Sequence, residues 1–255
     1  MYENEGDYMA LTSIDISITN NNLKGYVEIN STKTGSASSA ISYVLISRRK
    51  HGLQYDYTRI YEKVINNVNQ LTFSDNDLSV KSGETYDYYI ELTDGISSGY
   101  TTIEFGEIEN VACWFDGLFV GNEDKQYFAP LDCDTTTTRV TQANYVMTLV
   151  GRTPYRVSNS SANYTTGQSS GLFVPFDENS KIKIQQTKEY IKEVVDFLTD
   201  GTGKILKTTD GEAWHVSIDP EINITSDDHY IGSSKIEFNW TETGDIPEIK
   251  KVVSE

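Results

Sequence analysis

The stretch "TLVGRTPYRVSNSSANYTTGQSSGLF", residues 148–173, is rich in Ser, Thr, Asn and Gly and has no charged residue after Arg156. It lies between segments 139–152 and 171–177, which have the apolar content expected of strands. A ribbon of uncharged polar residues between two strands is either an active-site loop or an architectural extension. The function depends on which of the two it is.

One pattern in the ribbon suggests catalysis, because Gly167-Gln168-Ser169-Ser170-Gly171 matches the G-x-S-x-G sequence of serine hydrolases. A nucleophile elbow needs a buried strand before the serine and a helix directly after it. Here a run of polar residues precedes Ser169 and the strand-like "LFVPF" follows it, and the chain has only three histidines. We therefore predict that the ribbon is not a hydrolase site and that the chain is not an enzyme.

The composition limits the partners that the chain can have. Its 255 residues include 38 acidic and 21 basic side chains, a net charge of −17. Such a surface repels phosphates, so we expect no sequence-specific binding of nucleic acid, although nucleic acid could slide past it. The longest apolar runs are too short to cross a bilayer, which predicts no membrane insertion. The N-terminal "MYENEGDYMALTS" lacks the features of a signal peptide, so we expect synthesis in a cytoplasm.

Short alternating segments separated by turn residues predict an all-β first part. These segments are 23–31, 40–49, 57–65, 70–75, 85–95 and 100–105. Six or seven short strands in roughly 100 residues, without a helical period, are typical of a β-sandwich.

The stretch "LSVKSGETYDYYIEL", residues 78–92, resembles the E–F corner of fibronectin type III and related immunoglobulin-like modules. There a Leu, a Gly turn and a Tyr precede an alternating strand, and Leu78, Gly83 and Tyr86 take these places, with Tyr86 as the corner tyrosine. The chain departs from many such modules at Tyr26, where they carry Trp. The resemblance covers about residues 9–107 and implies an immunoglobulin-like sandwich without implying a ligand.

The second part contains the one segment with a helical period. One helix face collects the apolar residues Tyr190, Ile191, Val194, Val195 and Leu198. Gly201 and Gly203 then supply a stop. The pattern predicts a helix over 188–198.

Two strands flank Asp210-Gly211, the strongest short signal of a β-hairpin. A two-residue turn there pairs Ile205 with Val216 and predicts a core face made of Ile205, Trp214, Val216 and Ile218. The last strand, 234–240, alternates so that one face carries Ile236, Phe238 and Trp240.

This order of elements resembles the domain shared by phage tail-tube proteins, distal tail proteins and baseplate hubs. The matching pieces are Gly151-Arg152-Thr153-Pro154, the ribbon through Tyr164, Gly167 and Gly171, the helix 188–198, "DGEAWHVSI" and "IEFNWTETGD". The resemblance covers about residues 111–245. It implies two packed sheets with one helix, a β-hairpin extending from the body, and copies that pair edge to edge so that their sheets line a channel.

The predicted fold is therefore mainly β. An immunoglobulin-like β-sandwich spans 1–108, and a tail-tube-like β-sandwich or split barrel, with one α-helix and a long extended hairpin, spans 109–255. The low charge of the ribbon favours packing between copies, because long charged side chains resist burial. The predicted inter-subunit residues of the hairpin are Arg152, Tyr155, Ala162, Tyr164, Gly167 and Gly171.

The resemblance implies a structural subunit of a phage tail, in the distal tube or baseplate region, that contributes to tail assembly, host attachment and genome delivery. Its partners would be further copies of itself in a ring, other tail and baseplate proteins, and the DNA that the ring surrounds. Its location would be the virion tail, assembled in the bacterial cytoplasm. The alternative is a surface adhesin or carbohydrate-binding module.

The remaining candidate sites have structural interpretations. "DGTGK", 200–204, lacks the spacing of a phosphate-binding loop, and no cofactor fingerprint is present. The candidate ligands of a divalent cation are Asp219, Asp227, Asp228 and His229, but we expect these residues to form a solvated acidic loop. Two buried thiols are favoured over a disulfide between Cys113 and Cys133. Core anchors, rather than sugar platforms, are expected at Trp114, Trp214 and Trp240.

Overall fold

The computed structural model describes residues 7–54, 57–96, 99–122, 125–147, 154–176, 181–183, 186–227, 233–244 and 251–253, with the backbone alone at 7, 142–147, 154–162, 226–227 and 251–253. The chain is mainly β, as predicted, and α1 (Lys188–Leu198) is the one α-helix of these residues. A 3-10 turn, η1 (Val68–Leu71), precedes β6. The strands are β1 (Asp7–Ala10), β2 (Ile14–Asn21), β3 (Tyr26–Lys33), β4 (Tyr43–Lys50), β5 (Thr58–Val64), β6 (Phe73–Asp77), β7 (Thr85–Thr93), β8 (Thr102–Ala112), β9 (Leu118–Gly121), β10 (Gln126–Ala129), β11 (Leu131–Met147), β12 (Pro154–Leu172), β13 (Lys204–Lys207), β14 (Ala213–Asp227), β15 (Ser233–Gly244) and β16 (Lys251–Val253).

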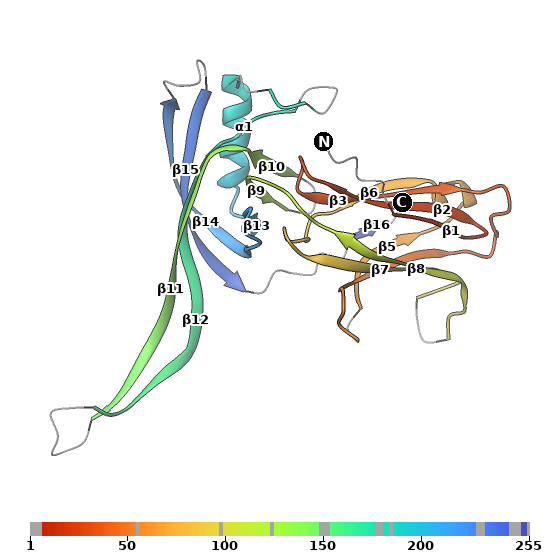
Figure 1. Ribbon diagram of the computed structural model, residues 1–255, viewed down its shortest axis with the longest axis horizontal. Coiled ribbons are helices and arrows are strands. Elements are labelled where there is room, and N and C mark those ends of the chain that lie inside the picture. The colour runs from red at the N-terminus through yellow and green to blue at the C-terminus, as the bar shows by residue number, and fades with distance from the viewer. Residues whose placement is uncertain are drawn as a thin grey trace.

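Two sheets pack face to face in the first part, on the right of Figure 1. One sheet has the order β1-β2-β3-β6 and the other the order β16-β5-β4-β7-β8, in which β16 runs parallel to β5. Alternating side chains from both sheets form one core, which includes Ile16, Ile18, Val44, Ile46, Tyr88 and Ile90. The predicted β-sandwich is therefore present, with β1 and β2 as strands that the sequence patterns did not identify.

The corner before β7 is built around Tyr86. Its hydroxyl accepts a hydrogen bond from the backbone N–H of Lys81 at 3.1 Å. Between them Gly83 has a φ of 76°, in the left-handed region that glycine enters without steric cost. The turn and the tyrosine together fix the point at which β7 enters the sandwich.

A single seven-stranded sheet, in the order β10-β9-β13-β14-β15-β12-β11, makes up the second part. Helix α1 has the predicted bounds, and its buried residues Val194, Phe197 and Leu198 pack in one core with Phe238 and Trp240. Thr187 caps the helix, because its hydroxyl accepts from the N–H of Tyr190 at 3.1 Å. The alternation predicted for the last strand is confirmed in β15, where Ile236, Phe238 and Trp240 are buried.

The Asp210-Gly211 hairpin exists, but its predicted register is wrong by one residue. Ile205 pairs with His215 instead of Val216. Gly211 has a φ of 86° and ends a three-residue loop, where the prediction assumed two residues. A shift of one residue moves every side chain to the other face of its strand, so Leu206, and not Ile205, joins the core beneath α1.

Three further predictions need correction. The return strand is not 171–177, because the polar ribbon itself forms β12 from Pro154 to Leu172. Trp114 is 57% exposed, because it lies in the connection between β8 and β9 and faces no core. Both cysteines are free thiols, but only Cys113 is buried, since Cys133 lies near the start of the edge strand β11.

The two parts meet at a continuous buried joint. Phe115, Phe119 and Phe128 follow β8 in the chain, yet they belong to the core of the sandwich and not to the core beneath α1. At the other end of the chain, β16 pairs with β5 of the sandwich. The sandwich core therefore extends past residue 108, and the joint is built from side chains of both parts.

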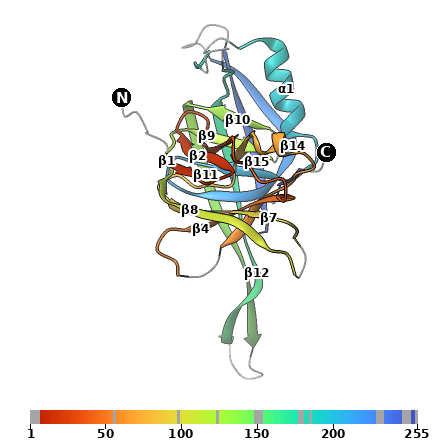
Figure 2. The ribbon, with the colours of Figure 1, turned by 90° about the vertical axis from the view of Figure 1, so that its right-hand side faces the viewer.

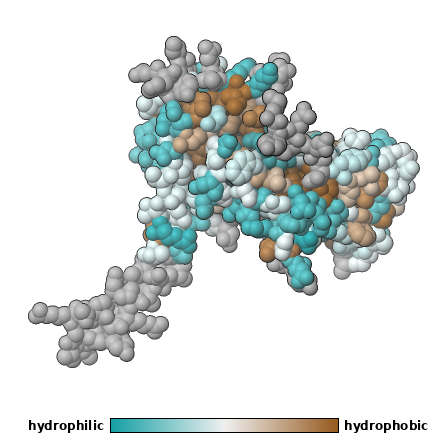
Figure 3. All heavy atoms as spheres, in the orientation of Figure 1, coloured by the Kyte–Doolittle hydropathy of each residue, from teal (hydrophilic) through white to brown (hydrophobic). Residues whose placement is uncertain are grey.

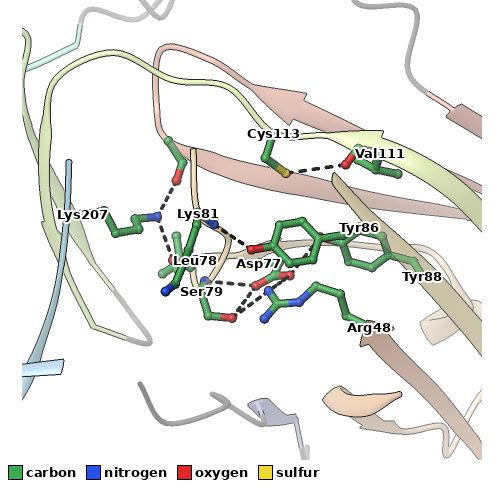
Figure 4. Close-up of polar contacts among 11 residues, drawn as sticks. Arg48, Asp77, Leu78, Ser79, Lys81, Tyr86, Tyr88, Val111, Cys113 and Lys207 are labelled. Carbon is green, nitrogen blue, oxygen red and sulfur yellow. Dashed lines mark hydrogen bonds and ion pairs between the residues drawn. The ribbon is translucent and has the colours of Figure 1, made fainter. Parts of the chain in front are cut away.

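Lys207, the last residue of β13, is the polar centre of this joint (Figure 4). It is 1% exposed, and its Nζ donates to the carbonyls of Gly25 at 2.5 Å and Leu78 at 2.8 Å. The rings of Phe115 and Phe119 lie 5.1 and 5.8 Å from the same nitrogen. Burial lowers the pKa of Lys207 to about 7. The amine has enough N–H groups in either protonation state to donate to both carbonyls.

A second buried polar group lies beside Lys207 in Figure 4. The Asp77 carboxylate accepts from Arg48 Nη1 at 2.5 Å and from the Tyr88 hydroxyl at 2.9 Å through Oδ2. Its Oδ1 accepts from the hydroxyl and the N–H of Ser79 at 2.8 and 3.0 Å. Burial alone would raise the pKa of Asp77, but Arg48 and Ser79 hold that pKa below its ordinary value. Each buried charge here thus has partners within the chain.

Candidate assembly surface

The two longest strands of the molecule, β11 and β12, form a hairpin that leaves the body at the end opposite α1 (Figures 1 and 2). They pair from Leu131 opposite Leu172 to Met147 opposite Pro154. Four consecutive threonines, Thr135–Thr138, lie in β11, and β-branched residues suit a strand. The polar ribbon is thus an architectural strand.

Most of this hairpin has a bare edge. β11 is the last strand of its sheet and pairs with β12 alone. β12 pairs with β15 only over Thr166–Gly171, so within the described structure residues 154–165 have a partner strand on one side only. The N–H and C=O groups of such an edge are available for pairing with another chain.

Trp240 of β15 anchors the root of the hairpin. Its Nε1 donates to Ser169 Oγ at 2.9 Å, and that hydroxyl lies 3.1 Å from Thr135 Oγ1 of β11. A Cβ on Gly167 would lie 2.5 Å from the Trp240 ring and 2.5 Å from the Thr136 carbonyl oxygen. Gly167 therefore serves close packing inside the subunit.

The pairing of the two strands is interrupted at residues 160–162. Thr141 pairs with Asn163 and Ala143 with Asn159, so three residues of β12 face one residue of β11. Extra residues on one strand bend it and increase its twist. Figure 1 shows the hairpin curving away from the sheet, which carries its distal half away from its own subunit.

The described side chains of the hairpin stem are polar but almost uncharged. Arg139 is the one charged residue in 135–141 and 163–171, and its Nε donates to Asn163 Oδ1 at 2.6 Å. Tyr164, opposite Val140, is 37% exposed. The coloured part of the stem is mostly white and teal in Figure 3. Another subunit could cover such a surface and bury few charges, among which are Arg139 and, at the foot of β11, Asp132 and Asp134.

A groove of about 620 Å³ lies at the foot of the hairpin. Alternate residues of β11 line one side of it, and the β13–β14 turn lines the other; they include Thr135, Thr137, Arg139, Thr209, Asp210 and Glu212. The groove extends the exposed surface beside the bare edge of β11.

The predicted inter-subunit residues fall in different surroundings. Arg152 lies outside the described residues, and the structure gives only the backbone of Tyr155 and Ala162, both in β12. Tyr164 lies on the surface of the stem, whereas Gly171 lies inside, where a Cβ would be 2.7 Å from that of Ala129. Their part in assembly stays a prediction.

The first half of β11 lies outside the predicted strand, which begins at residue 139. The run of β-branched threonines, Thr135–Thr138, was the signal that could have identified it.

Ser169 does not form a nucleophile elbow. It is fully buried in the middle of β12, the strand continues on both sides of it, and its hydroxyl is bonded to Trp240. The G-x-S-x-G match therefore arises from two closely packed glycines, Gly167 and Gly171, on either side of a serine with a structural role.

The predicted acidic loop lies partly outside the described residues. Asp219 is exposed on β14, while Asp228 and His229 lie outside the described residues. Within the described part, three carboxylates that approach within 4.8 Å are those of Asp87, Glu107 and Glu109. Asp87 is already paired with Arg49 at 3.0 Å and His51 at 2.7 Å, so we interpret this group as an ion-pair network.

Comparisons with known proteins give distant structural matches only. No protein-family model and no curated protein matches the chain. A chain of the "Virion of native gene transfer agent (GTA) particle" shares 12% identity at a TM-score of 0.32, over 50% of this chain and 92% of that chain. A chain of the "Tail of empty GTA particle computed with helical refinement, C6 symmetry" shares 15% identity at a TM-score of 0.30, over 50% and 91%.

Similarity of this extent carries no functional argument, so the function is argued from the chain's own residues. In the part of the chain that the structure describes, no helix has the length and apolar character needed to cross a membrane.

Proposed function

We propose that this chain is a structural subunit of a phage tail or related injection machine, in the distal tube or baseplate region, where copies form a homo-oligomeric ring. The observation that carries the proposal is the β11–β12 hairpin, which is anchored at its root by Trp240 and bare along most of its edges. Backbone groups that become buried must find partners. In a ring, the edges of neighbouring copies supply them.

We keep the division of the chain into 1–108 and 109–255 as part of the proposal, with β8 running on to Ala112 and β16 returning to the sandwich sheet. The strand order β2-β3-β6 facing β5-β4-β7-β8, with the hydrogen bond between Tyr86 and Lys81, supports an immunoglobulin-like first domain. The seven-stranded sheet with α1 and a projecting hairpin supports a tail-tube-like second domain. The first domain would be a lateral arm held by the joint at Lys207.

The sheet face opposite α1 suits the wall of a channel. Its polar residues on neighbouring strands include Thr136 and Thr138 on β11, Gln168 on β12 and Asn239 on β15, and its charged residues on these strands include the acidic Asp134 and Glu237. Together with the net charge of −17, such a face lets DNA pass without binding its phosphates. The partners would be other copies and other tail proteins in the virion, assembled in the bacterial cytoplasm.

Charges placed in the middle of the hairpin test this function. Ala162→Glu combined with Tyr164→Lys should block ring formation and incorporation into particles, because a charge buried between subunits is costly. The melting temperature of the isolated subunit should stay nearly unchanged, because Tyr164 is exposed, the proposal requires Ala162 to face outward as well, and surface substitutions cost little. Light scattering gives the mass, and purified particles give the incorporation.

A matched control exists on β1 of the sandwich, where Tyr8 and Ala10 are exposed. Ala10→Glu combined with Tyr8→Lys makes the same change of residue types away from the hairpin and should assemble normally. Assembly by the hairpin variant would reject the proposal. A wild-type chain that is a strict monomer and absent from particles would favour the surface-adhesin alternative.

A further inference from the structure

Three aromatic rings form a row on the outer face of the five-stranded sheet. Tyr57 precedes β5, Tyr89 lies on β7 and Phe105 lies on β8. The ring centroids of Tyr57 and Tyr89 are 5.6 Å apart, and those of Tyr89 and Phe105 are 6.0 Å apart. Because Tyr88 and Ile90 point into the core, Tyr89 between them points outward. We call Tyr57, Tyr89 and Phe105 the aromatic row.

The row is not needed for the core of the sandwich. Phe105 is 64% exposed although it lies inside a strand. Exposed apolar residues that are scattered singly need no explanation, but contiguous ones mark interaction sites. Tyr100, in the β7–β8 connection, is 38% exposed and adds a further aromatic side chain close to Tyr89.

Carboxylates flank the aromatic row. In the strand register Glu91 lies opposite Phe105, and Glu107 lies opposite Tyr89. Glu91 accepts from the Thr102 hydroxyl through Oε1, and Glu107 accepts from Arg49 Nη2 through Oε1 at 3.0 Å. Glu91 is half-buried and Glu107 is exposed, so a ligand on this face can reach both carboxylates. The rim of the row therefore offers hydrogen-bond acceptors.

The nearest cation is already engaged. Arg49 Nε donates to Asp87 at 3.0 Å, Nη2 donates to Glu107, and the guanidinium lies 4.5 Å over the Tyr57 ring. Arg49 thus covers one end of the row and leaves the Tyr89–Phe105 end open. Among these described residues, an anionic ligand would meet the carboxylates of Glu91 and Glu107 and only the already paired Arg49.

The geometry selects among the remaining ligand classes. Successive rings are tilted by 47° and 35°, so they form a platform and not the box of rings that encloses a quaternary ammonium group. A proline-rich peptide presents backbone carbonyls, which need donors from the protein, whereas this rim offers acceptors. A neutral sugar has a C–H face that packs on aromatic rings and hydroxyl groups that donate to carboxylates.

We propose that the aromatic row binds a neutral saccharide, with a sugar ring stacked on Tyr89 and Phe105 and its hydroxyls donating to Glu91 and Glu107. The exposed Trp114 and the packed Trp214 and Trp240 have no part in this site. The proposal gives the first domain a role in host attachment, but it does not depend on ring formation, because the site lies wholly within one sandwich.

The test is saccharide binding by the full chain. The probes are an array of neutral oligosaccharides of glucose, galactose, rhamnose and N-acetylglucosamine, followed by calorimetric titration of those that bind. Phe105→Ala should weaken binding roughly tenfold, the factor expected for the loss of one aromatic contact. Glu91→Gln, which keeps the shape but removes the charge, should also weaken it. Since Phe105 is largely exposed, its replacement should leave the melting temperature nearly unchanged.

The control is Tyr8→Ala, which removes an aromatic residue of similar exposure, 63%, from the other sheet of the sandwich; it should bind as the wild type does. The proposal is overturned if no array member binds the wild-type chain, or if Phe105→Ala binds as tightly as Tyr8→Ala. It is also overturned if a proline-rich peptide or tetramethylammonium binds at Phe105 and the saccharides do not. Light scattering of the same samples gives their oligomeric mass, so a failure to bind saccharide can be distinguished from a failure to assemble.

Discussion

The joint at Lys207 and the β11–β12 hairpin both contain polar groups, and the partners of these groups differ between the two regions. At the joint, a buried lysine, arginine and aspartate each find partners within the chain. Along the hairpin, uncharged side chains surround backbone edges that lack a neighbouring strand in the described structure. The first arrangement stabilises one subunit, and the second leaves hydrogen-bonding capacity for another.

The largest expected effect comes from breaking the joint at Asp77. Asp77→Ala leaves Arg48 buried without its carboxylate and removes the acceptor of the Tyr88 hydroxyl. Removal of one partner of a buried ion pair costs about 3–5 kcal/mol. Denaturant unfolding should therefore show a loss of that size in the free energy of unfolding. Asn76→Ala, one residue earlier and exposed, should change it by less than about 0.5 kcal/mol.

The next effect is a dependence of stability on pH. In the folded chain, burial lowers the pKa of Lys207 from 10.5 to about 7. Between these values the unfolded chain binds more protons than the folded chain, so the free energy of unfolding should rise with pH. Above pH 9 the Cys113 thiol, whose pKa burial raises to about 12, acts in the opposite direction. The free energy of unfolding should therefore rise between pH 7 and 9, by on the order of 1 kcal/mol per pH unit.

Lys207→Met isolates this contribution, because it keeps an unbranched apolar side chain and removes the titrating group. Urea unfolding of both chains at pH 7, 8 and 9 gives the difference, in which all other titrating groups cancel. The wild type should gain stability relative to Lys207→Met as the pH increases. Parallel curves over this window would show that Lys207 keeps its charge in the joint.

Gly167→Val tests how tightly the root of the β11–β12 hairpin is packed. A side chain there meets the Trp240 ring and the Thr136 carbonyl, and overpacking of this kind costs about 1–3 kcal/mol. Because the change displaces the root, it should also reduce assembly. Gly35→Val is the control, since nothing lies within 4 Å of a Cβ at Gly35. If Gly167→Val is as stable as Gly35→Val, the root is looser than its contacts indicate.

Local patterns in the sequence predicted the elements whose contacts are local. The helix α1 matched its predicted bounds because its apolar period and its stop signals lie within one segment. β15 matched because one alternating face is buried. The Asp210-Gly211 register failed because Ile205 and Leu206 are both apolar, so the pattern could not distinguish a two-residue loop from a three-residue loop.

Features built from distant segments could not be predicted in this way. A lysine is expected at the surface, and Lys207 is buried only because Gly25, far away in the chain, presents its carbonyl. The aromatic row combines residues from three separate segments, and no one of them shows a pattern. β16 pairs with a strand near the other end of the chain, which no local signal indicates.

The smallest expected effect concerns Ser169, which the sequence predicted to be non-catalytic despite its G-x-S-x-G match and which accepts a hydrogen bond from Trp240 in the structure. Ser169→Ala leaves the Nε1–H of Trp240 buried without its partner, which should cost about 1–2 kcal/mol in the free energy of unfolding. Trp240→Phe and the double variant complete a double-mutant cycle, and a coupling energy of at least about 0.5 kcal/mol is expected for residues in contact. Assembly should persist in Ser169→Ala, because the bare edges of the hairpin keep their backbone groups. A coupling energy of zero would show that the hydrogen bond between Ser169 and Trp240 does not stabilise the root of the hairpin. The root would then be held only by the packing of Gly167 against the Trp240 ring.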